Sequence, residues 1–270
     1  MKIGIALPQC LGRGSGDLLA RVDALPVLPS HVPVWCSWDN GSAGPPGAAF
    51  PTREVAGLTD RGIRPVIFWQ PAGPASQHAS ILRGDHDGYI DGWAHAAADW
   101  GGTVLARFAW EQNWGMPWGP GRNGNTAASY ISMWRYVVGR VRSIAPRVLF
   151  WWCPNVTPVA AIDDTWPGDP WVDRVGLDGY AWRAPLRPAS TLYGPALDVL
   201  RRLSDRPVLI GEFGVAAGIT GRRAWLRDTV RWFDSHGITA AIYFSIDMRW
   251  AKQPDWRLPP TMWASLQPPG

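Results

Sequence analysis

The sequence contains only three cysteines, Cys10, Cys36 and Cys153, and no CxxC pair. This odd and widely spaced set predicts neither a disulfide framework nor a zinc cluster, so we expect three buried free thiols. The chain also lacks an apolar run near the roughly 20 residues that a membrane-spanning helix requires. We therefore expect no metal site and no membrane span.

Charge is scarce too, because only 18% of the residues are Asp, Glu, Lys or Arg. Lys2 and Lys252 are the only lysines, and the remaining basic residues are scattered arginines with two doublets, Arg201-Arg202 and Arg222-Arg223. Solvated helix faces explain these doublets better than a nucleic-acid-binding stripe does, so no nucleic-acid partner is expected. The sequence also lacks a P-loop, a GxSxG elbow and an HExxH motif, which removes the usual anchors of phosphoryl transfer, α/β-hydrolase and zinc-protease chemistry.

Tryptophan, in contrast, is abundant, with 19 residues in a chain of 270 that is 46% hydrophobic. This apolar content is sufficient for one sizeable core, and some of the tryptophans must belong to it. Flat apolar rings with a polar edge also suit a sugar, which is apolar on its faces and hydroxylated around its rim. Several tryptophans stand beside Gly, Pro or Asn in segments that resemble loops: Trp114, Trp118, Trp166, Trp171, Trp182, Trp250 and Trp256.

Short β-rich runs alternate with segments of helical spacing along the whole chain. Runs of Val, Ile, Leu and Phe are typical of parallel strands covered on both faces. We expect helices after Asp87, Thr126 and Thr220, the last one stopping at Gly237. The eight expected strands are 2–7, 32–37, 64–69, 103–109, 147–152, 174–177, 207–210 and 238–244.

Eight such units predict an α/β fold, a (β/α)₈ TIM barrel that forms one catalytic domain over residues 1–270. A doubly wound sheet is the competing fold, and the glycines of segment 12–16 favour it. The dinucleotide-binding fingerprint, however, needs a third glycine where Asp17 stands, so we interpret this segment as a flexible first loop.

Two glutamates stand at ends of expected strands, where a barrel carries its active site. Glu111 follows the fourth strand, and Glu212 follows the seventh. Cleavage of a glycosidic bond needs one acid to protonate the leaving oxygen and one carboxylate to meet the oxocarbenium-like centre. Paired carboxylates at one barrel mouth therefore predict a glycosidase, whereas a single such glutamate would more often pair with an arginine or cap a helix.

At these residues the chain resembles glycoside hydrolase family 26, a mostly β-mannanase family of the clan A barrels. The resemblance runs nearly the full length of the chain. It covers segments 67–71 (IFWQP), 87–94 (DGYIDGWA), 107–118 (RFAWEQNWGMPW), 151–155 (WWCPN), 167–180 (PGDPWVDRVGLDGY), 207–214 (PVLIGEFG) and 255–258 (DWRL).

The resemblance implies a retaining double displacement with Glu111 as acid/base and Glu212 as nucleophile. Arg107 and the hydroxyl of Tyr180 are expected to hold Glu212 ionised, because a cation and a hydrogen bond both favour the charged form. Trp110, together with Trp114 and Trp118, is expected to keep the proton on Glu111 by desolvation.

Two departures from the family bear on the sugar that is recognised. Trp110 stands where the family usually has His, and Gln70 stands where it often has Glu. Further residues are expected to bind substrate or support the site, although core packing or loop turns are the alternative for each: Trp69, Trp152 and Trp182, with Asn113 and Asn155 as sugar or carboxylate contacts.

The sequence thus predicts a retaining endo-acting hydrolase of a β-linked polysaccharide, with mannan first and β-glucan or another bacterial cell-envelope polysaccharide second. A catalytically silent carbohydrate-binding barrel and, more remotely, a nicotinamide enzyme stay open as alternatives. No cofactor is expected, and the protein is expected to act as a monomer. The resemblance implies secretion, although the five apolar residues after Lys2 are too few for a signal peptide and are needed as the first strand.

Overall fold

The computed structural model describes residues 1–12, 16–38 and 50–266. Eight parallel strands form one sheet in the order β1-β8-β7-β6-β5-β4-β3-β2. This confirms the expected (β/α)₈ barrel. The strands are β1 (Lys2–Ala6), β2 (His31–Ser37), β3 (Arg64–Gln70), β4 (Val104–Phe108), β5 (Val148–Trp152), β6 (Arg174–Ala181), β7 (Val208–Val215) and β8 (Ala240–Phe244).

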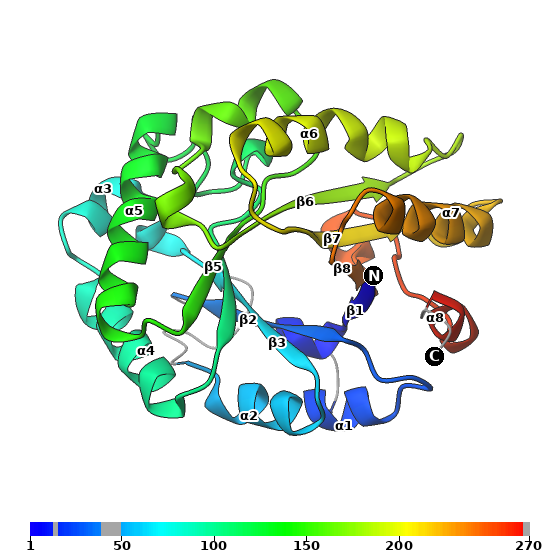
Figure 1. Ribbon diagram of the computed structural model, residues 1–270, viewed down its shortest axis with the longest axis horizontal. Helices are drawn as coiled ribbons and strands as arrows, with labels where there is room; N and C mark the ends of the chain where they lie inside the picture. The colour runs from blue at the N-terminus through cyan, green and yellow to red at the C-terminus, as the bar shows by residue number, and fades with distance from the viewer. Residues whose placement is uncertain (13–15, 39–49, 267–270) are drawn as a thin grey trace.

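Helices surround the sheet, with α3, α4 and α5 on one side and α7 on the other (Figure 1). Their apolar faces pack against strands that are buried along nearly their whole length, which is why those strands read as continuous apolar runs. The helices are α1 (Leu18–Asp23), α2 (Thr52–Asp60), α3 (His78–Leu82), α4 (Asp87–Trp100), α5 (Ala127–Ile144), α6 (Ala189–Leu203), α7 (Arg222–Ser235) and α8 (Pro260–Leu266).

The three helices expected from sequence are α4, α5 and α7. Helix α5 begins at a capping box, in which the Ser129 amide donates to the Thr126 hydroxyl at 3.0 Å and the Thr126 amide donates to the Ser129 hydroxyl at 2.9 Å. Helix α4 is followed by Gly101 at φ 78°, a left-handed position that favours glycine. The glycine-rich segment 12–16 includes residues 13–15, which lie outside the described residues.

The seam between β1 and β2 completes the barrel. The Ser30 amide donates to the Ile3 carbonyl at 2.9 Å, and Gly4 of β1 lies directly against His31 of β2. A Cβ atom at Gly4 would lie 2.7 Å from the Cβ of His31, so a larger residue would push the strands apart.

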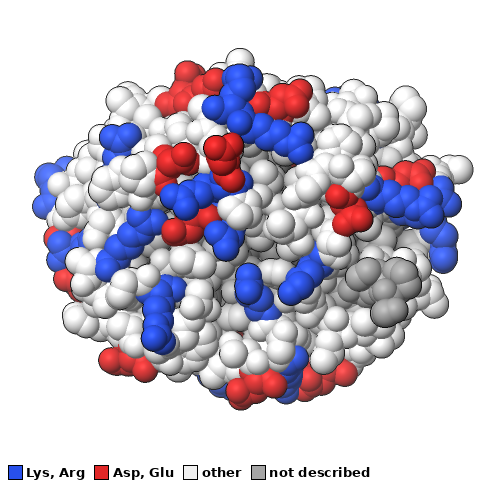
Figure 2. Space-filling model, in the orientation of Figure 1, with Lys and Arg blue, Asp and Glu red and all other residues white. Residues whose placement is uncertain are grey.

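All three cysteines are buried and carry free thiols. Within residues 1–12, 16–38 and 50–266, no helix is long and apolar enough to cross a lipid bilayer. On the face shown in Figure 2, basic side chains are interspersed with acidic ones and do not gather in one continuous stripe.

Candidate active site

A cavity of about 280 Å³ opens at the carboxyl ends of the strands. Glu111 reaches it from the loop after β4 and Glu212 from β7, while Tyr180 reaches it from β6. Trp110 and Asn155 also line it. Both glutamates expected from sequence therefore border the same cavity, on the face where barrels carry their chemistry.

The chain leaves β4 through an irregular turn that aims Glu111 at this cavity. Ala109 and Glu111 both adopt left-handed backbone conformations, with φ values of 42° and 50°. Non-glycine residues pay a steric cost in this region, so the surrounding structure must hold them there. It does so through the Glu111 amide, which donates to the Cys153 carbonyl at 2.9 Å, and the Tyr130 hydroxyl, which donates to the Ala109 carbonyl at 2.9 Å.

The Glu111 carboxyl group is buried, with 6% of its residue surface exposed. Its pKa is raised from 4.5 to about 7, chiefly by burial and then by the nearby charge of Glu212, while Arg107 and Asn155 oppose the shift. The side-chain Nδ2 of Asn155 donates to Glu111 Oε1 at 2.7 Å. A carboxyl group of this kind keeps its proton at near-neutral pH and is suited to act as an acid.

Asn155 is in turn fixed by Asn113, from the loop that follows Glu111. The backbone N–H of Asn155 donates to Asn113 Oδ1 at 2.8 Å, and Asn113 Nδ2 donates back to the backbone carbonyl of Asn155 at 2.9 Å. This reciprocal pair joins the loops after β4 and β5. Asn113 therefore positions the donor that contacts Glu111, rather than reaching the cavity itself.

Glu212 is positioned by a β-bulge. Along β6 and β7, Leu177 pairs with Ile210 but Asp178 pairs with Glu212, which leaves Gly211 as the extra residue. A bulge of this kind re-aims the following side chain and occurs often beside active sites. Gly211 is also required sterically, because a Cβ there would lie 2.5 Å from an oxygen of Asp178.

Two donors hold the Glu212 carboxylate. Arg107 donates to Oε1 at 2.8 Å, and the Tyr180 hydroxyl donates to Oε2. Burial, followed by the charge of Glu212, raises the pKa of Tyr180 well above 10, which keeps its hydroxyl proton available for this bond. Both partners expected from sequence are thus in contact with Glu212.

Arg107 is fully buried and bridges two carboxylates, because its second terminal nitrogen donates to Asp178. Its guanidinium group lies 4.2 Å from the ring centroid of Phe68 and 5.2 Å from that of Trp110. Asp178 is the functional residue that sequence reasoning missed. The signal was a carboxylate directly after the expected strand 174–177, but its partner is distant in sequence.

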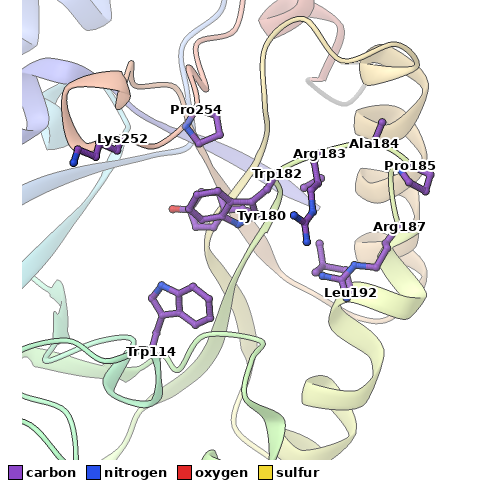
Figure 3. Close-up of a pocket in the computed structure, with 11 residues that line it drawn as sticks. Trp114, Tyr180, Trp182, Arg183, Ala184, Pro185, Arg187, Leu192, Lys252 and Pro254 are labelled. Carbon is purple, nitrogen blue, oxygen red and sulfur yellow. The ribbon is translucent and has the colours of Figure 1, made fainter.

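A wider cleft of about 900 Å³ adjoins the cavity that Glu111 and Glu212 line. The two share Trp114, Tyr180, Trp182, Arg187 and Leu192 in their walls. Trp114 is 46% exposed and Trp182 is 40% exposed, and in Figure 3 they lie on opposite sides of the open space. These rings offer flat apolar surfaces to a ligand.

The remaining expected site residues lie behind the cavity. Trp118 is buried and donates its indole N–H to the Trp110 carbonyl at 2.8 Å, so it supports the turn that carries Glu111. Trp69 and Trp152 have no exposed surface. Trp69 stacks on Trp93 of α4 at 4.3 Å between ring centroids, and Trp152 packs against Trp166 at 4.9 Å.

We therefore correct the expected place of Trp69 and Trp152 on the floor of a substrate site. Trp69 is directed toward the helix layer rather than the barrel mouth, and both rings belong to the core. Among the described residues, no group of three or more His, Cys, Asp or Glu side chains is placed to hold a metal ion.

No family model matches the chain. Among curated proteins, Endoglucanase H of Acetivibrio thermocellus is 26% identical over 210 residues, which cover 72% of this chain and 22% of that protein. The chain thus spans about a fifth of this relative's length.

Among solved structures, a GH26 β-mannanase from Bacteroides ovatus superposes with a TM-score of 0.68 at 17% identity, covering 98% of this chain and 86% of the other. The endoglucanase Cel5A from Thermotoga maritima superposes with a TM-score of 0.67 at 15% identity, covering 94% of each chain. The expected resemblance is therefore confirmed for the fold, which is similar to that of the GH26 β-mannanase and of the endoglucanase.

Proposed function

We propose that the protein is a retaining, endo-acting glycoside hydrolase that cleaves a β-linked polysaccharide. The observation that carries this proposal is the presence of two carboxyl groups in one cavity with opposite surroundings. Glu111 is buried with a raised pKa, whereas Glu212 accepts hydrogen bonds from Arg107 and Tyr180. Enzymes that use one carboxyl group as acid and another as nucleophile separate the two roles in this way.

In the first step Glu111 donates its proton to the leaving glycosidic oxygen while the Glu212 carboxylate attacks the anomeric carbon. The sugar–oxygen bond breaks and a covalent glycosyl-enzyme forms. In the second step Glu111, now ionised, removes a proton from water, and the hydroxide displaces Glu212 with net retention of configuration. Asn155 positions Glu111 in both steps, and Arg107 and Tyr180 position Glu212.

Endo-action is proposed by likeness to the two endoglucanases, and the cleft beside the catalytic cavity offers room for further sugars of a chain. Mannan is the first substrate class, by likeness of fold to the Bacteroides β-mannanase, and β-glucan is the second, by likeness to the two endoglucanases. Trp110 borders the cavity where the family usually has His, so substrate contacts at this wall differ from those of the family pattern.

The test uses the three glutamates of the chain. Glu111→Gln and Glu212→Gln should each lower reducing-end release from mannan and β-glucan at least a thousandfold. Glu54→Gln is the matched control, because Glu54 lies on α2 and pairs with Arg53 outside the cavity. Ordinary turnover by either cavity variant would remove that glutamate from the mechanism.

Azide rescue separates the two roles. On an activated β-aryl glycoside, azide should occupy the space that the Glu212 side chain leaves in Glu212→Ala. It should attack the anomeric carbon from that side and give the α-glycosyl azide. In Glu111→Ala, azide should displace the intact Glu212 ester and give the β-glycosyl azide. The reverse pair of products would exchange the assignments, and binding without cleavage of any polysaccharide would favour a carbohydrate-binding barrel.

A further inference from the structure

The outer cleft has a strongly one-sided charge. Arg183, Arg187 and Lys252 are among its lining residues, and no Asp or Glu is found among the described residues that line it. Figure 3 places Arg183 and Arg187 on the α6 side and Lys252 on the far side, with Tyr180 and Trp182 between them. The cations thus flank the aromatic platform on which a sugar would lie.

No acidic side chain in the described residues pairs with any of these three cations. The loop after β8 makes the contrast clear, since Arg249 pairs with Asp247 at 2.6 Å and Arg257 pairs with Asp255 at 2.7 Å. Lys252 stands between these two pairs without such a partner.

The position of the cations fits substrate recognition better than fold stability. All three side chains are exposed, so they contribute little to packing. They are supplied by two separate loops, after β6 and after β8, that both border this cleft. Two guanidinium groups and one ammonium group around a sugar platform form a binding surface for carboxylate, sulfate or phosphate groups.

We infer that the cleft selects an acidic polysaccharide, one whose sugars carry anionic groups in the subsites beside the catalytic cavity. This inference rests on the proposed hydrolase function and names the substrate class of that same site. A neutral mannan or glucan would leave the three cations without counter-charges, whereas a chain of acidic sugars would pair with them along the direction of the groove. The catalytic carboxyl groups lie in the inner cavity and remain available for chemistry.

The test compares polysaccharides that share a backbone and differ in charge. Carboxymethyl cellulose is paired with hydroxyethyl cellulose, and carboxymethylated galactomannan with the unmodified polymer. We expect kcat/KM, measured by reducing ends, to be higher on the anionic member of the cleaved pair, and the advantage to shrink between 20 mM and 500 mM salt because exposed charges are screened. Cellulose sulfate distinguishes a general anion preference from a carboxylate preference.

The decisive variants are matched in charge and in residue type. Arg183→Gln/Lys252→Gln removes two cleft cations, and Arg64→Gln/Lys2→Gln removes two exposed cations at the opposite, amino-terminal ends of β3 and β1. Each lost cation should lower the anionic-to-neutral ratio of kcat/KM by roughly two- to fivefold in the cleft variant only. An equal loss in both variants, or no preference for the anionic polymers, would overturn the inference.

A binding measurement tests the charge preference of the cleft without relying on hydrolysis. In native gels containing carboxymethyl cellulose, the inactive Glu212→Gln protein should be retarded more than in hydroxyethyl cellulose, and the two cleft substitutions should remove most of this difference. If no polysaccharide is cleaved, the hydrolase proposal fails while these gels still decide the charge preference. Equal retardation of the cleft and control variants would refute an anion-selective cleft.

Discussion

Removal of the Asn155 side chain tests the electrostatics of the cavity most directly. The hydrogen bond from Asn155 to Glu111 favours the ionised carboxylate and so lowers the pKa of Glu111 against the larger effect of burial. Asn155→Ala should therefore raise this pKa further above about 7. In a retaining mechanism the acid must be protonated for the first step, so kcat/KM falls as pH rises through this pKa.

The size of the shift follows from the bond that is lost. A hydrogen bond to a charged group contributes about 1.5–3 kcal/mol, and about 1.4 kcal/mol corresponds to one pKa unit. Two effects reduce the pKa shift below this value. Asn155 lines the cavity, so water can replace part of its hydrogen bond to the carboxylate, and the protonated form of Glu111 also loses a weaker hydrogen bond from Asn155. We expect the alkaline limb of kcat/KM to move upward by about 0.5 to 1 pH unit.

The assay is the pH profile of kcat/KM, which reports the free enzyme, on a soluble oligosaccharide between pH 4 and pH 10. Gln253→Ala is the matched control, because it removes another amide from the wall of the same cavity without a hydrogen bond to Glu111 in the described structure. Its alkaline limb should stay in place. An unchanged limb in Asn155→Ala, or a limb at lower pH, would refute the assignment of Glu111 as the acid.

Two further predictions concern stability. The pKa of Glu111 is 4.5 when unperturbed and about 7 in the fold. The unfolded chain therefore loses this proton at lower pH, and the free energy of unfolding falls as pH rises between these values. Glu111→Gln, measured by urea unfolding, should stabilise the protein by up to about 3 kcal/mol at pH 8.5 but little at pH 4. Arg107→Met leaves Asp178 and Glu212 buried without their cation and should lower the free energy of unfolding by about 3–5 kcal/mol. The control Arg140→Met breaks partly exposed ion pairs and should lower it by about 1 kcal/mol. Similar losses in both variants would contradict the buried bridge.

The sequence by itself determined the barrel and the two carboxylates at its mouth. Parallel strands buried on both faces must be apolar along their length, so a local pattern identified all eight. Glu111 and Glu212 interrupt that pattern near the carboxyl ends of strands, the edge at which a barrel carries its active site. Even so, β6 and β7 continue to Ala181 and Val215, beyond the expected ends, because Asp178 and Glu212 break an apolar run without breaking the strand.

Only the tertiary structure decided how these groups are held and which aromatic rings reach the cleft. Asp178 and Arg107 are 71 residues apart in sequence and meet because β4 and β6 flank the same strand, β5, at a place kept open by Gly211. Trp69 and Trp182 both stand near strand ends, yet one lies against the helix layer and the other borders the cleft. Side-chain direction at a strand end depends on bulges, turns and neighbouring loops, and these are contacts between segments that no local pattern contains.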